Sequence, residues 1–302
     1  MKKYLLFLLP VIALCTLFAF RAEKSVLLRV HLQKGSTYLY KTSLNQNLVT
    51  QIAGQSMNAK VTMESGMDLK VTEKYKDSML MNAIYRHMAV NLSSMGRHQI
   101  VLDSRDSSGG TGSRFKKFFS TLQAHPVVIK TDAEGNILDM RGLEQLQQAV
   151  NASGATSNPA ARKLLDNLLS DETFKHHFTN LGIFPDKPVA VGDHWERTTH
   201  VNNMVTVDVH TTLTVNDIQP DKVLLGIKAD MSSQRDSATI QGMTIPVHLT
   251  GTQTGTYTID RATGLISSGA IDQKINMKMS MMGQDMATDI TGTYNVSESL
   301  EK

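Results

Sequence analysis

The stretch LTVNDIQPDKVLL, residues Leu213–Leu225, decides the fold because an earlier stretch repeats its pattern. LKVTEKYKDSMLM, residues Leu69–Met81, aligns with it without a gap, with alternating apolar residues, a polar turn containing aspartate and a second apolar run. We therefore predict two degenerate copies of a β-rich unit, at about residues 25–140 and 186–300, packed around one shared core.

Two further pairs of segments support the repeat. Gly35–Tyr38 and Gly192–Trp195 have the same spacing from glycine to an aromatic residue. Asp132–Gly135 and Asp260–Gly264 lie where each copy closes a hairpin. The matched position of Trp195 and Tyr38 indicates a packing anchor at the start of each unit, with substrate stacking as the alternative for the tryptophan.

Apolar and polar residues alternate over long stretches of both copies. Val61–Val71, Val205–Val215 and Ile271–Met281 all show this period of two. The pattern is typical of antiparallel strands with one packed face and one solvated face, whereas a doubly wound parallel sheet would give continuous apolar runs. We predict a mainly β (α+β) fold in which the antiparallel strands form a curved sheet or an open barrel.

The middle of the chain has helical periodicity. Phe115, Phe118 and Phe119 recur at helical spacing, and short amphipathic stretches follow within a helical insert at about residues 113–182. Because an amphipathic helix and a one-sided sheet must each bury an apolar side, we expect the insert to cover the concave face of the sheet. Residues 23–302 then form one β-rich domain.

The N-terminus has the layout of an export signal. Met1-Lys2-Lys3 is basic, and the apolar run Tyr4–Phe20 follows. We expect residues 1–22 to be a signal peptide or an uncleaved N-terminal anchor, and Cys15 within the run leaves a lipoprotein as a third possibility. The predicted location is the periplasm or the cell envelope, with membrane contact only through the N-terminus.

Charge and cysteine content exclude several classes of function. Loss of residues 1–22 removes Lys2, Lys3 and Arg21 and no acid, so the formal charge falls from +3 to zero. A neutral chain has no electrostatic basis for binding nucleic acid. Cys15 is the one cysteine, so the domain has neither a disulfide nor a thiolate nucleophile.

No motif predicts catalysis or a cofactor. The glycine-rich segment Gly109–Ser113 lacks the ending of a P-loop and is better interpreted as a linker with a helix cap. Ser113 and Lys116 have the spacing of some serine acyl-enzymes without their supporting motifs. The ten histidines include no spacing typical of a metal site. We assign no catalytic residue, no metal ligand and no cofactor.

Methionine is the compositional anomaly, with 17 in the chain. The alternating methionines of the last stretch have three interpretations: a Cu(I) site, an adaptable apolar groove, or ordinary core residues. With the phenylalanines of the insert, they give our predicted set of ligand-facing residues: Met63, Met67, Phe115, Phe118, Phe119, Met277, Met279 and Met281.

The chain resembles a family of exported bacterial β-rich proteins of unknown function. The resemblance rests on Lys34-Gly35 with Tyr38 and Tyr40, on Leu102-Asp103-Ser104, on Phe184–Trp195 and on Tyr257–Gly264. Its most specific element is Pro-Val-x-Val-Gly-Asp-x-Trp, which ends at Trp195. The resemblance implies an export or lipoprotein signal and no established activity.

Two main hypotheses about function follow. The first is a non-enzymatic envelope protein that binds a lipid or another apolar or amphipathic ligand between sheet and helices. The second is a structural or interaction module with a full interior, which contacts an envelope protein partner through the hairpin tips at Met57, Met243 and Met286. A hydrolase, in which His194 and Glu196 would contribute to a cleft, and a Cu(I)-binding protein come third.

Overall fold

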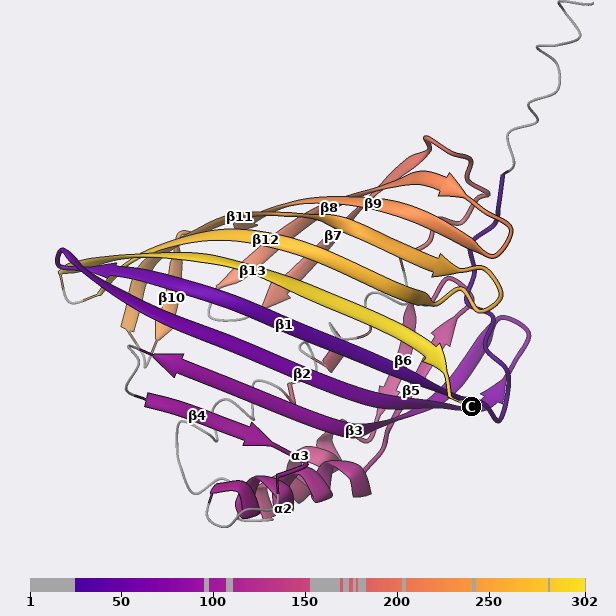
Figure 1. Ribbon diagram of the computed structural model, residues 1–302, viewed down its shortest axis with the longest axis horizontal. Helices are drawn as coiled ribbons and strands as arrows, with labels where there is room; N and C mark the ends of the chain where they lie inside the picture. Colours follow the sequence, from indigo (N-terminus) through magenta and orange to yellow (C-terminus); the bar gives the residue numbers. More distant parts are fainter. Residues whose placement is uncertain are drawn as a thin grey trace, which may run out of the picture.

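The computed structural model describes residues 25–94, 98–106, 111–152, 169–170, 174–175, 178, 183–202, 205–240, 243–281 and 283–301 (Figure 1). The expectations for the N-terminal signal and for Cys15 therefore lie outside the described residues. So does most of the second half of the helical insert. Within the described ranges, no helix is long and apolar enough to cross a membrane.

Strands make up most of the domain, as the alternation predicts. The first copy contributes β1 (Thr37–Ile52), β2 (Gln55–Lys74), β3 (Ser78–Ser94), β4 (His98–Asp103), β5 (Val127–Asp132) and β6 (Ile137–Arg141). The second copy contributes β7 (His194–Asn202), β8 (Thr206–Ile218), β9 (Lys222–Ser233), β10 (Ser237–Ile240), β11 (Met243–Asp260), β12 (Ile266–Met281) and β13 (Gln284–Leu300). The helices are α2 (Thr111–Ala124) and α3 (Leu143–Ala152).

All thirteen strands belong to one antiparallel sheet that is curved and not closed into a barrel (Figure 1). The first copy has the order β6-β5-β3-β2-β1, and the second has the same order, β12-β11-β9-β8-β7. β13 lies between β1 and β12 and joins the copies, while β4 pairs with β3 and β10 with β11. The fold predicted from the repeat and the alternation is confirmed.

The matched segments make the same hydrogen bonds in both copies. The N–H of Gly35 donates to the carbonyl of Val71, and the N–H of Gly192 donates to that of Val215, each at 2.8 Å. Both glycines have positive φ, 88° and 93°, which a residue with a Cβ adopts at a cost. Both hairpins also shift register directly after that valine. The sequence repeat is therefore a repeat of backbone geometry.

An extended segment before β1, residues 25–36, crosses the end of the sheet and touches both copies. We call it the N-terminal strap. The N–H of Val30 donates to the carbonyl of Ala133 at 2.8 Å, and the N–H of His31 donates to that of Thr263 at 2.7 Å. Arg29 adds an ion pair with Glu134 at 2.9 Å. The strap thus binds the two matched turns, one from each copy, through adjacent residues.

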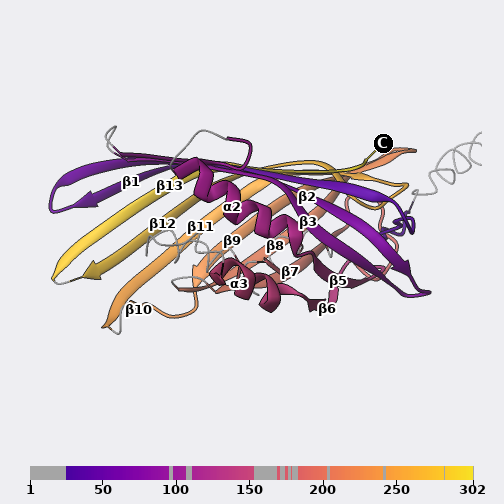
Figure 2. The same ribbon diagram turned by 90° about the horizontal axis from the view of Figure 1, so that it is seen from below.

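The main core lies on the concave face of the sheet. Figure 2 shows α2 and α3 on this side, with α2 near β3 and β4. Phe115, Phe118 and Phe119 of α2 are buried in the same apolar cluster as Met81 and Met67 of the sheet. Each such side chain contributes about 2 kcal/mol of transfer free energy on burial. The expected helical cover over one face is therefore present in the described part of the insert.

A second, smaller apolar cluster lies toward the far end of the second copy. Val207, Ala229 and Val247 are buried in it, with Met277 and Met279 packed partly against them. Among the described residues, the two clusters are separate on the concave face. The region between them holds the candidate site.

Candidate ligand cavity

A cavity of about 420 Å³ lies on the concave face of the sheet. We call it the concave-face cavity. It is lined by Leu44, Gln46, Ile183, Arg197, Thr199, Val201, Val209, Thr211, Leu213, Ile227, Met231, Gln253, Tyr257, Ile271, Gln273 and Tyr294. Its volume is within the range of small-molecule pockets, and most of its wall is apolar.

The polar side chains of this cavity lie in one row across the sheet. The register pairs Arg197 with Thr211, Thr211 with Ala229, Ala229 with Gln253, Gln253 with Gln273, Gln273 with Gly292 and Gly292 with Gln46. We call this set the transverse row. It runs from β7 at one edge of the sheet to β1 at its centre, with the small residues Ala229 and Gly292 between the long side chains.

Mostly apolar rows flank the transverse row on both sides. One flanking row runs from Trp195 through Leu213, Ile227, Gly255, Ile271 and Tyr294 to Leu44. The other runs from Thr199 through Val209, Met231, Gly251, Ile275 and Ile290 to Leu48. The arrangement is a polar track between two apolar ones, and it can accept a molecule with both kinds of surface.

Arg197 carries the one charge of the cavity wall among the described residues. Burial lowers the pKa of its guanidinium, and the negative charge of Asp132 partly opposes that shift. Asp132 is engaged elsewhere, since its carboxylate accepts hydrogen bonds from the backbone and side chain of Asn136 at 2.7 and 2.9 Å. No described carboxylate forms an ion pair with Arg197, which remains a half-buried cation facing the cavity.

The side-chain amide nitrogen of Gln273 is the second polar group of the cavity without a partner among the described residues. Gln273 is 7% exposed, and its Nε2 makes no hydrogen bond with a described residue. Its Oε1 accepts a long hydrogen bond of 3.4 Å from Nε2 of Gln253. A buried amide N–H without an acceptor is costly, so its retention beside a cavity is unusual.

Two tyrosines form the wall next to the main core. The Tyr294 hydroxyl lies 3.4 Å from that of Tyr40. The Tyr257 ring packs over Gly269, where a Cβ would lie 2.5 Å from Cδ1 of the ring.

Glu298 is a buried acid farther along β13, opposite Tyr40 on the concave face. It is 4% exposed, and neither carboxyl oxygen makes a hydrogen bond of ordinary geometry with a described residue. Burial raises the pKa of Glu298 to about 8, and the nearby backbone of Ile266 offsets only part of that rise. The side chain is therefore neutral at pH 7, and it does not line the concave-face cavity.

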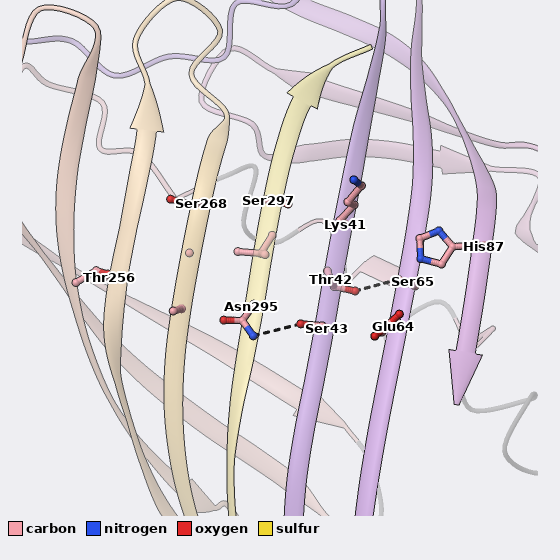
Figure 3. Close-up of a pocket in the computed structure, with 13 residues that line it drawn as sticks. Lys41, Thr42, Ser43, Glu64, Ser65, His87, Thr256, Ser268, Asn295 and Ser297 are labelled. Atoms are coloured by element: carbon pink, nitrogen blue, oxygen red, sulfur yellow. Dashed lines mark hydrogen bonds between the residues drawn. The ribbon is translucent and has the colours of Figure 1, made fainter. Parts of the chain in front are cut away.

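A second hollow, of about 530 Å³, lies on the opposite face of the sheet (Figure 3). Its side chains, among them Lys41, Ser43, Glu64 and Asn295, occupy strand positions that alternate with buried ones such as Tyr40. Figure 3 shows polar side chains on neighbouring strands, with hydrogen bonds between Thr42 and Ser65 and from Asn295 to Ser43. Ala270 and Val296 are the larger apolar lining residues of this hollow, whereas leucine, isoleucine, valine and tyrosine side chains line the concave-face cavity, which is the better candidate for holding an apolar ligand.

The predicted ligand-facing residues lie elsewhere. Phe115, Phe118, Phe119 and Met67 belong to the main core, and Met277 and Met279 border the second cluster. Met63 is half-buried on β2, and the side chain of Met281 lies outside the described residues. None of the seven described side chains lines the concave-face cavity, and their contact with a ligand stays a prediction.

The structure also gives the positions of the residues considered for a hydrolase cleft and for partner contacts. His194 and Glu196 are exposed on β7 and face away from the cavity. Of the hairpin tips, Met57 and Met286 are half-buried, and the side chain of Met243 is not described. Among the described residues, no three histidine, cysteine or acidic side chains are grouped as metal ligands would be.

Sequence reasoning missed the transverse row, although a signal was present. Arg197 stands in phase with Trp195 and Thr199, so it occupies a position that faces the core. Gln273 stands in phase with Ile271 in the same way. A charged or amide residue at a core-facing position of an alternating strand is the sign that could have identified the site.

Several solved structures are similar at low level. A lipovitellin structure titled for lipid–protein interactions is 12% identical with a TM-score of 0.49, covering 90% of this chain and 26% of its own. The autotransporter NalP translocator domain from Neisseria meningitidis is 5% identical with a TM-score of 0.30, covering 88% and 90%. An outer-membrane channel from Pseudomonas putida F1 is 6% identical with a TM-score of 0.26, covering 89% and 97%. Similarity at this level says nothing about function.

The sequence comparisons are more decisive. No curated protein matches the chain. The model of a family of unknown function, DUF6263, matches residues 76–266. This match spans more than half of the chain and reaches from the first copy into the second, so the protein belongs to the DUF6263 family.

Proposed function

We propose that this protein is an exported binding protein of the cell envelope that holds an apolar or amphipathic ligand on the concave face of its sheet and catalyses no reaction. The observation that carries the proposal is the concave-face cavity, with its polar row between apolar walls. Export is supported by the basic and apolar N-terminal sequence, Met1–Phe20.

The apolar walls supply the affinity in this proposal. Val201, Val209, Leu213, Ile227 and Ile271 present branched aliphatic side chains to the cavity. Each methylene of a ligand chain buried against them gains about 0.8 kcal/mol. A chain with eight buried methylenes gains roughly 6 kcal/mol before the loss of translational and rotational freedom. Such a chain binds without any covalent step.

The first test is native mass spectrometry of the full chain, made with its own N-terminal segment and purified gently from the envelope fraction. A stoichiometric adduct of lipid size, identified after solvent extraction, is the expected result. A bare mass that persists after incubation with lipids and with Cu(I) would contradict ligand binding and leave the interaction module as the better hypothesis.

Two variants on β7 test whether the adduct is bound in the concave-face cavity. Thr199→Trp places a large ring inside the cavity, because Thr199 lines it. Glu196→Trp places the same ring on the opposite, exposed face of the strand. We expect the adduct to disappear in the first variant and to remain in the second. Equal retention in both would place the ligand outside the concave-face cavity.

A further inference from the structure

We infer that the ligand is an anionic amphiphile, with its negative group at Arg197 and its neutral polar atoms along the transverse row. The inference rests on the proposed function and specifies its ligand class. It begins with charge: among the described residues, the lining of the concave-face cavity contains Arg197 and neither an aspartate nor a glutamate. The cavity therefore favours a negative group and disfavours a positive one.

Arg197 has the properties of an anchor for such a group. It is half-buried on the edge strand β7, faces the cavity and has no ion-pair partner among the described residues. A guanidinium forms two parallel hydrogen bonds with a carboxylate or a phosphate, and these bonds are stronger where water is excluded. A bound anion would supply the partner that the described residues do not supply.

Gln273 gives independent evidence for acceptor oxygens on the ligand. Its side chain lines the cavity and is more than nine-tenths buried, and its Nε2 has no acceptor among the residues that the structure describes. An ester, amide or hydroxyl oxygen of the ligand would satisfy this donor. The two unpartnered groups are thus both donors, and a molecule rich in acceptor oxygens complements both.

The spacing of the donors indicates an extended polar part. Arg197 on β7 and Gln273 on β12 are four strand steps apart in the sheet. At about 4.8 Å per step this is roughly 19 Å along a flat sheet, and the concave curvature and the long side chains shorten the gap. A single head group does not span it. A phosphate joined through glycerol to an acyl ester has acceptors at several points along its length.

The flanking rows receive the apolar part of the molecule. Leu213, Ile227 and Ile271 on one side and Val209 and Met231 on the other lie beside the polar track. A single acyl chain lying along either row keeps its head group on the transverse row. A single-chain lysophospholipid therefore fits the chemistry of the whole cavity.

The test compares two probes that differ in one group. 1-Oleoyl-lysophosphatidate carries a phosphate, and monoolein has the same glycerol and acyl chain without it. Trp195, the one tryptophan of the chain, lies two residues before Arg197 on the same face of β7, so its fluorescence reports binding. We expect the full-length wild type to bind lysophosphatidate about 10- to 100-fold more tightly than monoolein, as expected for a charged hydrogen bond.

Variants assign that preference to Arg197. Arg197→Gln is expected to weaken lysophosphatidate binding far more than monoolein binding and so to remove the preference, and Arg197→Lys is expected to keep part of it. Arg235→Gln is the matched control, because Arg235 is exposed and lies outside the cavity. Thermal unfolding of each variant confirms that the domain is folded, and the Lys variant gives the answer where the Gln variant is unstable.

The outcomes separate this inference from the proposed function. Binding of monoolein as tight as that of lysophosphatidate, or a preference that survives Arg197→Gln, would overturn the anionic ligand alone. A wild type that binds neither probe would overturn this inference, and a bare mass in the native spectrum as well would overturn ligand binding altogether. Glycerol 3-phosphate that binds as tightly as the lipid would show that the site recognises a free phosphate ester and would overturn the amphiphile.

Discussion

The backbone N–H of His31 donates a hydrogen bond of 2.7 Å to the carbonyl oxygen of Thr263. One residue earlier, the N–H of Val30 donates to Ala133, the equivalent turn of the other copy. The N-terminal strap therefore links the copies at the end of the sheet where their matched turns lie. Removing one of these donors tests what the link contributes.

Replacement of His31 by proline removes the N–H that Thr263 accepts. We expect His31→Pro to lower the free energy of unfolding by about 1–3 kcal/mol, because the Thr263 carbonyl loses its donor. His31→Ala keeps the N–H and removes only an exposed side chain, so it should change stability little. Urea unfolding followed by circular dichroism measures both. A proline variant as stable as the alanine variant would show that this hydrogen bond of the strap does not contribute to the free energy of unfolding.

Gly264 tests the contact between the strap and the second copy. It has a φ of 72°, and a Cβ there would lie 1.9 Å from the carbonyl oxygen of Arg29. Gly283 has a similar φ of 76° with no atom within 4 Å of a Cβ. We expect Gly283→Ala to cost about 1 kcal/mol from backbone strain alone and Gly264→Ala to cost clearly more. Equal shifts in the thermal midpoint would contradict the packing argument.

Glu298 predicts how stability depends on pH. Burial raises its pKa from 4.5 to about 8 in the folded protein. Below about pH 4 the Glu298 carboxyl is protonated in both the folded and the unfolded chain, so it does not lower the free energy of unfolding. As the pH rises to about 8, the unfolded chain loses the proton first and the folded state is progressively destabilised.

Glu298→Gln removes that dependence. We expect the variant to exceed the wild type in stability at pH 9 by up to about 5 kcal/mol, with little difference at pH 4. Glu64→Gln, at an exposed position on the other face of the sheet, serves as the control. Chemical denaturation at several pH values gives the comparison. A constant offset between wild type and Glu298→Gln would mean that the carboxyl is not the titrating group.

Substitution of Gln273 should affect the free energy of unfolding and the affinity for lysophosphatidate differently. Leucine at this position removes a buried donor without a partner, so Gln273→Leu should leave the free energy of unfolding unchanged or raise it by about 1 kcal/mol. The same change should weaken lysophosphatidate binding about tenfold, since an acceptor oxygen of the lipid loses its donor. Unfolding and Trp195 fluorescence titrations measure the two effects. Loss of stability without loss of affinity would identify Gln273 as a structural residue.

The fold could be predicted from local signals. The alternation in Val205–Val215 and the paired glycines Gly35 and Gly192 specify strands and turns through interactions between residues close in sequence. The spacing of Phe115 and Phe118 specifies a helix face in the same way. These features need no knowledge of which strands are neighbours, and the structure confirms them.

The candidate site could not be predicted because it depends on register. Gln46 and Gln273 are far apart in the sequence. They face the same cavity because both pair with Gly292 of β13, on either side of that strand. Arg197 joins the row only through the pairing of β7, β8 and β9. The spacing of residues within a single strand does not predict the transverse row. The methionines gave a stronger local signal, and Met277 and Met279 lie beside the second apolar cluster.

The position of β13 has a consequence for how the domain is made. It is the latest strand of the described chain, and it alone connects β1 to β12. Until it emerges during synthesis, each copy has an unpaired edge that can associate with other chains. The continuous sheet can therefore form only after β13 has been made.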